Sequence, residues 1–142
     1  MSCKEFVSGR SYIERINQKK MTKAQLEERL IQFAVLIIKI TNELPSNRAS
    51  NQLGGQLLRS GTSPALNYGE ARSAESLKDF IHKMQLVLKE LRESYVCLKI
   101  IHLSNLYKNE SSIVEAKSEC NELISIFVKS VQTATKRKMG SS

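Results

Sequence analysis

The chain has 142 residues, of which 41% are apolar and 25% charged, with a net charge of +8. This length suits a single domain, and six glycines with two prolines leave little room for low-complexity sequence. The three cysteines are widely spaced, which argues against a disulfide framework and a zinc site. The first 20 residues lack the apolar core of a signal peptide, and the longest apolar run, Leu30–Ile40, is shorter than the roughly 18–20 residues of a membrane span. We therefore expect a cytoplasmic protein, not membrane-bound, without cofactor or metal.

The excess positive charge lies at the two ends of the chain. Residues 1–23 contain six basic and two acidic residues, and residues 129–142 contain four basic residues and no acidic one. The segment 24–128 has equal numbers of acidic and basic residues. This distribution indicates a concentrated basic surface rather than a uniformly basic protein.

In chain order, residues 1–22 form a polar, basic N-terminal extension. The first convincing helix begins near Thr22, with Gln25 completing a capping box, and it ends before Pro45. Its apolar residues recur every three or four positions, as a helix buried along one stripe requires: Leu26, Leu30, Phe33, Ile37, Ile40 and Leu44.

The second helical segment runs from Ser46 to Ser60 and meets Gly61-Thr-Ser-Pro64. Three readings are open: a phosphate-binding loop, a turn between helices, or a kink in one helix. A P-loop requires a strand, a different glycine spacing and a lysine after the second glycine, none of which is present. In the turn reading, Ser63 caps a new helix that has Pro64 in its first position.

Two longer helices follow. One begins at Glu75 or Ser76 and passes His102; the other begins at Ser111 or Ser112, with Glu115 as its capping-box partner, and frays into a basic tail after Ala134. We predict an all-α, antiparallel, up-down-up-down four-helix bundle over residues 23–138, with a tail at 139–142. This topology brings both chain ends, and therefore both basic segments, to one end of the bundle.

The segment Leu30–Ile40 has nine apolar residues in eleven and is apolar around its whole circumference. A helix of this kind is buried on more than one side. We therefore expect a homo-oligomer in which a neighbouring subunit covers the outer side of the first helix.

A longer pattern resembles a known family. It comprises Leu44-Pro45, Gln56-Leu57, Arg59-Ser60, Ser63, Asn67, Glu70-Ala71, Phe80, Lys83, Lys89-Glu90, Glu93 and Leu98. Over about residues 24–135 the chain resembles the bacterial 23S ribosomal RNA intervening-sequence proteins, with Pro64 in place of the usual Ile, Cys97 in place of an aromatic residue, and less typical glycines at 54 and 55.

The resemblance implies an antiparallel four-helix bundle that assembles as a barrel-like pentamer, as does the related accessory protein of diversity-generating retroelements. It also favours a kink in the second helix near Gly61–Pro64 over a ligand loop.

The family pattern contains a polar array on apolar-periodic helices. Its members are predicted to form an interhelical network of Arg–Glu and Asn–carboxylate contacts, because buried charges must be paired: Arg59, Asn67, Glu70, Glu90 and Glu93. The alternative, a metal site, would use paired Glu-x-x-His motifs. Asp79 and His82 have this spacing but lack a second pair.

We predict a non-enzymatic protein that binds RNA or DNA with little sequence preference through its basic ends. The residues expected to contact phosphate are Lys19, Lys20, Lys23, Lys136, Arg137 and Lys138. The alternative is a protein-interaction scaffold, such as an adaptor for a reverse transcriptase or another nucleic-acid enzyme.

Overall fold

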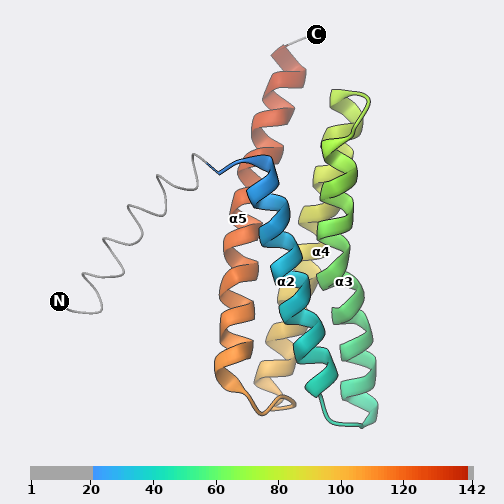
Figure 1. The fold of residues 1–142 in the computed structure, drawn as a ribbon, viewed down its shortest axis with the longest axis vertical. Coiled ribbons are helices and arrows are strands. Elements are labelled where there is room, and N and C mark those ends of the chain that lie inside the picture. The colour runs from blue at the N-terminus through green and yellow to red at the C-terminus, as the bar shows by residue number, and fades with distance from the viewer. Residues whose placement is uncertain (1–20, 141–142) are drawn as a thin grey trace, which may run out of the picture.

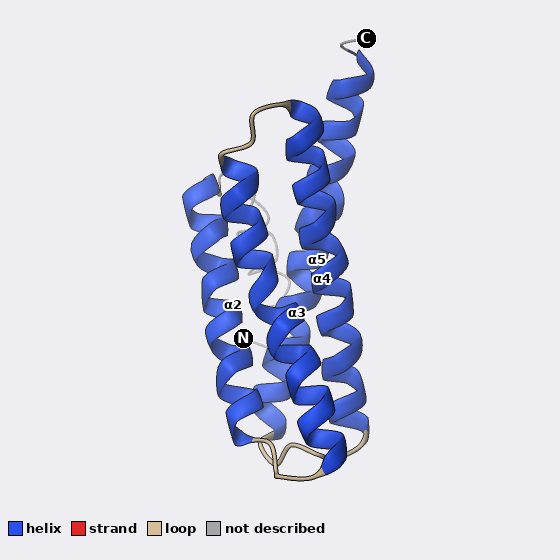
Figure 2. Cartoon of the chain, turned by 90° about the vertical axis from the view of Figure 1, so that its right-hand side faces the viewer, coloured by secondary structure: helices blue, strands red, loops and turns tan. Residues whose placement is uncertain are grey.

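The computed structural model describes residues 21–140, and these residues form a bundle of four α-helices without a β-strand (Figure 1). The helices are α2 (Lys23–Glu43), α3 (Arg48–Arg72), α4 (Leu77–Leu103) and α5 (Glu110–Gly140). Successive helices run in opposite directions and are joined by short loops at alternating ends (Figure 2). The predicted all-α, up-down-up-down bundle is confirmed.

The helix starts are set by side-chain caps. Thr22 and Gln25 form the predicted capping box, in which each side chain bonds to the backbone N–H of the other residue. Ser76 accepts a hydrogen bond from the N–H of Asp79 and caps α4. The cap of α5 is Asn109, which accepts from the N–H of Ser112 at 3.1 Å. The prediction that Ser111 or Ser112 caps this helix is wrong, because an Asn side chain two or three residues earlier takes that role.

Helix α3 continues through Gly61–Pro64 without interruption. The predicted N-cap at Ser63 is therefore wrong. The segment in which a kink is predicted lies inside one helix, where Pro64 removes the helical donor to the Ser60 carbonyl. Pro64 and Gly61 are both buried. Packing against the core thus keeps the segment helical even though its local sequence favours a break.

Gly61 is required for the close approach of α2 and α3. A β-carbon at this position would lie 2.7 Å from Cγ2 of Ile37, and one at Gly54 would lie 3.2 Å from Cδ1 of Leu44. Gly55, which is exposed, has no such neighbour. Two of the glycines that weaken α3 as an isolated helix therefore serve its packing.

The core is a single apolar cluster along the bundle axis, and its largest fully buried side chains come from α2, α3, α4 and α5. Tyr68 and Phe127 meet edge to face with ring centroids 5.5 Å apart. Helices α3 and α4 pack most closely, whereas α2 and α5 pack least closely. The bundle is therefore most open along the α2–α5 side.

The outward side of α2 is apolar, as the sequence predicts. Ile31, Val35 and Ile38 lie on one stripe and are 41%, 53% and 42% exposed in the single chain. The expectation that a neighbouring subunit covers them stays a prediction.

Candidate nucleic-acid interface and polar clusters

The structure places the described basic residues of the chain ends at one end of the bundle. Lys23 is the first residue of α2, and Lys136, Arg137 and Lys138 lie in the last turns of α5. Helix α5 extends past the start of α2 (Figure 1), so its basic turns project from the bundle. The prediction that the chain frays after Ala134 is wrong, because α5 continues to Gly140. Lys19 and Lys20 lie outside the described residues.

All four of these described basic residues are exposed. A structural role accounts for part of this pattern, because cations in a last helical turn interact favourably with the helix dipole. The dipole does not explain why acidic residues are missing: after Glu122, no acidic residue occurs in the rest of the chain. The last turns of α5 thus carry charge of one sign, which is the electrostatic arrangement that attracts phosphate. Acidic residues at this end of the bundle include Glu75 and Asp79, which belong to the α3–α4 connection and the first turn of α4.

Arg59, Glu90 and Glu93 form one interhelical cluster between α3 and α4. The Nη2 atom of Arg59 donates to both carboxylate oxygens of Glu93 at 2.8 and 2.7 Å, and Nη1 donates to Glu90 at 3.2 Å. Burial, followed by contact with Glu93, raises the pKa of Glu90. The charged groups of this cluster bond to one another and join α3 to α4.

The other two members of the predicted network lie elsewhere. Asn67 donates to the carbonyl and hydroxyl oxygens of Ser63 within the same helix. Glu70 accepts a hydrogen bond from Lys83 of α4 at 2.6 Å. The expected Asn–carboxylate contact is therefore replaced by a local bond, since Ser63 lies one turn before Asn67.

A buried pair of hydroxyls supports the same α3–α4 contact. Ser94 donates to the Ser60 hydroxyl at 2.9 Å, and both side chains are fully buried. Ser60 is the residue whose carbonyl loses its helical donor at Pro64. Two small hydroxyls allow the helices to approach at this level and satisfy each other's polar atoms.

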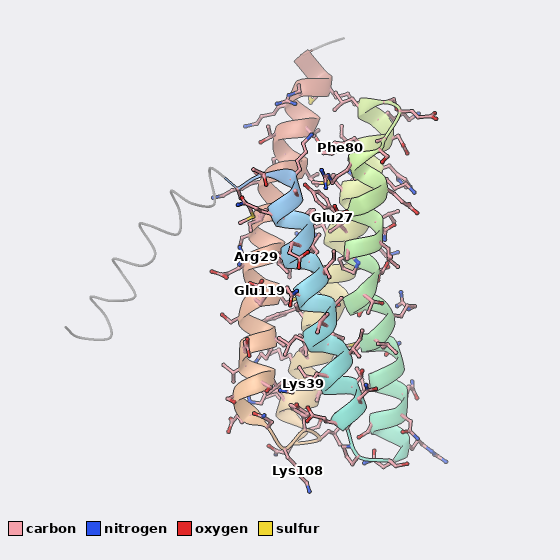
Figure 3. All side chains as sticks on the ribbon, in the orientation of Figure 1. Glu27, Arg29, Lys39, Phe80, Lys108 and Glu119 are labelled. Carbon is pink, nitrogen blue, oxygen red and sulfur yellow. The ribbon has the colours of Figure 1, made fainter. Side chains whose placement is uncertain are left out.

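Sequence reasoning missed a second charged cluster, which joins α2 to α5. Arg29 donates to Glu119 through two nitrogens at 2.8 and 2.6 Å, and to Glu122 at 2.7 Å. Figure 3 shows Arg29 and Glu119 facing each other between the two helices. The hydrogen bond with Glu119 raises the pKa of Arg29. These partners are about 90 residues apart in sequence, so only the lateral order of the helices brings them together.

Below this cluster, α2 and α5 border a groove of about 530 Å³. Phe33 and Leu36 supply its apolar wall, and Lys39, Glu115 and Glu119 are among its polar lining. The groove is lined by both acidic and basic side chains. Its charge is therefore mixed, unlike the charge of the last turns of α5, which is positive throughout.

The thiols of the described region are buried in the core, and no metal site is formed around them or around the histidines of residues 21–140. Cys97 and Cys120 are buried, and Cys120 donates to the Leu91 carbonyl at 3.1 Å. Burial raises the pKa of both thiols, that of Cys120 to about 12. Within residues 21–140, no group of three His, Cys, Asp or Glu side chains is placed to hold a metal ion. His82, of the Asp79–His82 pair, is exposed.

No helix within residues 21–140 combines the length and apolarity needed to cross a membrane.

The fold and its clusters define an all-α bundle whose helices are joined by polar contacts between their side chains and whose distinctive charge lies at one end. The family model described as 23S rRNA-intervening sequence protein matches residues 22–129, and the chain belongs to this family.

A solved structure supports the assignment. The chain is similar to a protein of unknown function from the S23 ribosomal protein family of Bacteroides thetaiotaomicron, at 26% sequence identity and a TM-score of 0.71. The similarity covers 79% of this chain and 99% of that chain. No curated protein matches the sequence.

Proposed function

We propose that the protein is a non-enzymatic, oligomeric bundle that binds the phosphate backbone of RNA through its basic end. The described residues of this basic end are Lys23, Lys136, Arg137 and Lys138. From the sequence we expect Lys19 and Lys20, which lie outside the described residues, to contact phosphate as well. One observation carries the proposal: the last turns of α5 are exposed and basic, contain no acidic residue, and project beyond the start of α2 (Figure 1).

The chemistry of this end favours backbone binding rather than base recognition. Lysine and arginine neutralise phosphates and release counterions, which gives affinity with little sequence preference and a steep dependence on salt. No aromatic residue occurs after Phe127, so base stacking by the end of α5 is not expected. We propose RNA rather than DNA as the ligand because the family is named for an intervening sequence of ribosomal RNA.

Apolar side chains on two opposite sides of the bundle support oligomer formation. The α2–α3 apolar face consists of exposed residues on adjacent helices: Ile31, Val35, Ile38, Leu58 and Leu66. The α4–α5 apolar patch is exposed on the other two helices: Val96, Ile100, Leu103 and Val114. Exposed apolar surfaces of this extent are typical of interaction sites.

Two different apolar surfaces on opposite sides favour a head-to-tail contact. In such a heterologous interface one surface of each subunit meets the other surface of the next, and the assembly closes into a ring when the rotation permits. We propose a ring of five subunits, the number that the family resemblance implies. The ring would gather several basic ends.

A filter-binding titration of RNA tests the role of these phosphate-binding residues. The variant Lys136→Gln/Arg137→Gln/Lys138→Gln should bind more weakly than wild type, and the slope of log K against log salt should become shallower by about 0.7 for each single-strand phosphate that the variant no longer neutralises. A matched control, Arg48→Gln/Lys99→Gln/Lys108→Gln, removes the same number and kinds of charge near the opposite end, where Figure 3 shows Lys108. Equal weakening in both variants would refute a localised basic site.

The second candidate function is a scaffold for a nucleic-acid enzyme, and the two apolar surfaces favour it. A scaffold would leave at least one surface for another protein, whereas a closed ring uses both. The mass of the purified protein by native mass spectrometry distinguishes these cases: a pentamer supports the ring, and a monomer at micromolar concentration removes it.

A further inference from the structure

A second basic surface lies away from the chain ends, in the groove between α4 and α5. The groove has a volume of about 350 Å³ and is lined by Gln85, Leu88, Lys89, Arg92 and Val131. Leu88 is buried and Val131 partly buried, whereas the other three side chains are exposed. The groove therefore has an apolar floor with an amide and two cations on its rim.

The nearest acidic residues of α4 bond to another helix. Glu90 lies next to Lys89 in the sequence and is rotated from it by about 100°, and its carboxylate bonds to Arg59 of α3. Glu93 is one turn after Lys89 and borders the same side of α4, but its carboxylate also bonds to Arg59. Neither residue lines the groove, so the charged residues that line it are both basic.

Helix α5 also directs its acidic residues away from the groove. Its last two acidic residues, Glu119 and Glu122, bond to Arg29 on the α2 side. Val131 lines the groove, and no acidic residue follows Glu122 in the chain. The acid-free part of α5 thus extends from the groove to Lys136 and the basic end of the bundle.

The cations of this surface are available for a ligand. Among the ion pairs of the described region, none involves Lys89 or Arg92. Lys89 and Arg92 are three residues apart, about 4.5 Å along the helix axis, and so are neighbours on one face. The planar guanidinium of an arginine binds phosphate through two parallel hydrogen bonds, and a neighbouring lysine adds a point charge.

We propose that the α4–α5 groove is a second phosphate-binding site, at which Lys89 and Arg92 hold an RNA strand that continues from the basic end. This inference rests on the proposed RNA binding and names a further surface for it. Gln85 donates to the same backbone or to ribose, and the Leu88–Val131 floor accepts the apolar side of a sugar or base. The α4–α5 apolar patch begins at Val96, one turn beyond Arg92, so subunit contacts and RNA use different lengths of α4.

A salt series on the full chain with a single-stranded RNA tests this site. Lys89→Gln/Arg92→Gln should weaken binding and lower the salt slope by about 1.4, the value for two phosphates on a single strand. The matched control Arg48→Gln/Lys108→Gln should lower it less. If the groove variant binds like this control while the terminal variant binds more weakly, the groove site is wrong and the proposed function stands. If wild type does not bind RNA at low salt, the proposed function itself fails.

Acetylation of lysines in the wild-type complex gives an independent test that does not depend on a variant. Bound RNA should protect Lys89 from the reagent, and the exposed Lys39 and Lys99 should react as in the free protein. Full reactivity of Lys89 in saturating RNA would overturn the site. Protection of Lys89 by duplex RNA but not by a single strand would also overturn it, because the proposed ligand is a single strand.

Discussion

The substitution Gly61→Ala tests the packing of α2 against α3 at a single atom. The added methyl group would lie 2.7 Å from Cγ2 and 2.8 Å from Cγ1 of Ile37, distances that real β-carbons do not adopt. Ile37 is fully buried and β-branched, so it has little rotamer freedom with which to move aside. The two helices must separate instead.

The expected loss of stability follows from two opposing effects. Overpacking a well-packed core costs about 1–3 kcal/mol, whereas replacing a helical glycine by alanine gains about 1 kcal/mol. Because two of the distances to Ile37 fall below 3.0 Å, we take the upper part of the cost and expect a net loss of about 2 kcal/mol. For a chain of this size that corresponds to a decrease in Tm of about 7 °C.

Thermal and urea unfolding followed by circular dichroism measure this loss at fixed protein concentration. The control is Gly55→Ala, because a β-carbon at this exposed position meets no atom within 4 Å; it should stabilise the protein by up to about 1 kcal/mol. In a double-mutant cycle, Ile37→Ala should reduce the cost of Gly61→Ala, since it removes both clashing atoms. A Gly61→Ala variant as stable as Gly55→Ala would refute the close approach.

Three further predictions follow from other regions. Ile38→Glu should leave the helical content unchanged and lower the native mass to that of a monomer, because it places a charge in the α2–α3 apolar face; an unchanged mass would exclude this face from the interface. Glu90→Gln should raise Tm at pH 7 but not near pH 4. The folded-state pKa of Glu90 lies above its unfolded value, so the wild-type protein loses stability as the pH rises through that pKa. The amide of the variant does not ionise, so the variant does not lose this stability. A gain that is equal at both pH values would contradict this cause. Cys97 and Cys120, studied in a Cys3→Ser background, should react with a thiol reagent at pH 8 only after unfolding, because burial raises both pKa values; rapid labelling of the native protein would show that this part of the core opens.

The fold could be predicted from the sequence because its signals are local and repeated. Leu26, Leu30, Phe33 and Ile37 define the buried stripe of α2 by spacing alone, and Thr22 and Gln25 define its start. The continuity of α3 through Pro64 could not be predicted this way. Local rules favour a break there, and the tertiary packing of Gly61 against Ile37 decides the outcome.

The candidate sites could be predicted only in part, for the same reason. The charge at Lys136, Arg137 and Lys138 is visible as an unbroken basic run. The basic groove at Arg92 is not visible, because Glu90 and Glu93 balance its charge in the sequence, and only the structure shows that both carboxylates bond to Arg59 of α3.

The Arg29 cluster likewise depends on which helices are neighbours. Its partners on α5, Glu119 and Glu122, are distant in the sequence, and the repeat of apolar residues does not specify that α2 and α5 lie side by side.

The most direct test of the proposed function is the affinity of the wild-type protein for a single-stranded RNA, measured at several salt concentrations. Binding to phosphate predicts high affinity at low salt and a linear decrease of log K with log salt, with a slope of about −0.7 for each phosphate neutralised. RNAs of unrelated sequence should give nearly the same line. Absence of binding at low salt, or an affinity that does not change with salt, would contradict backbone binding by the basic end.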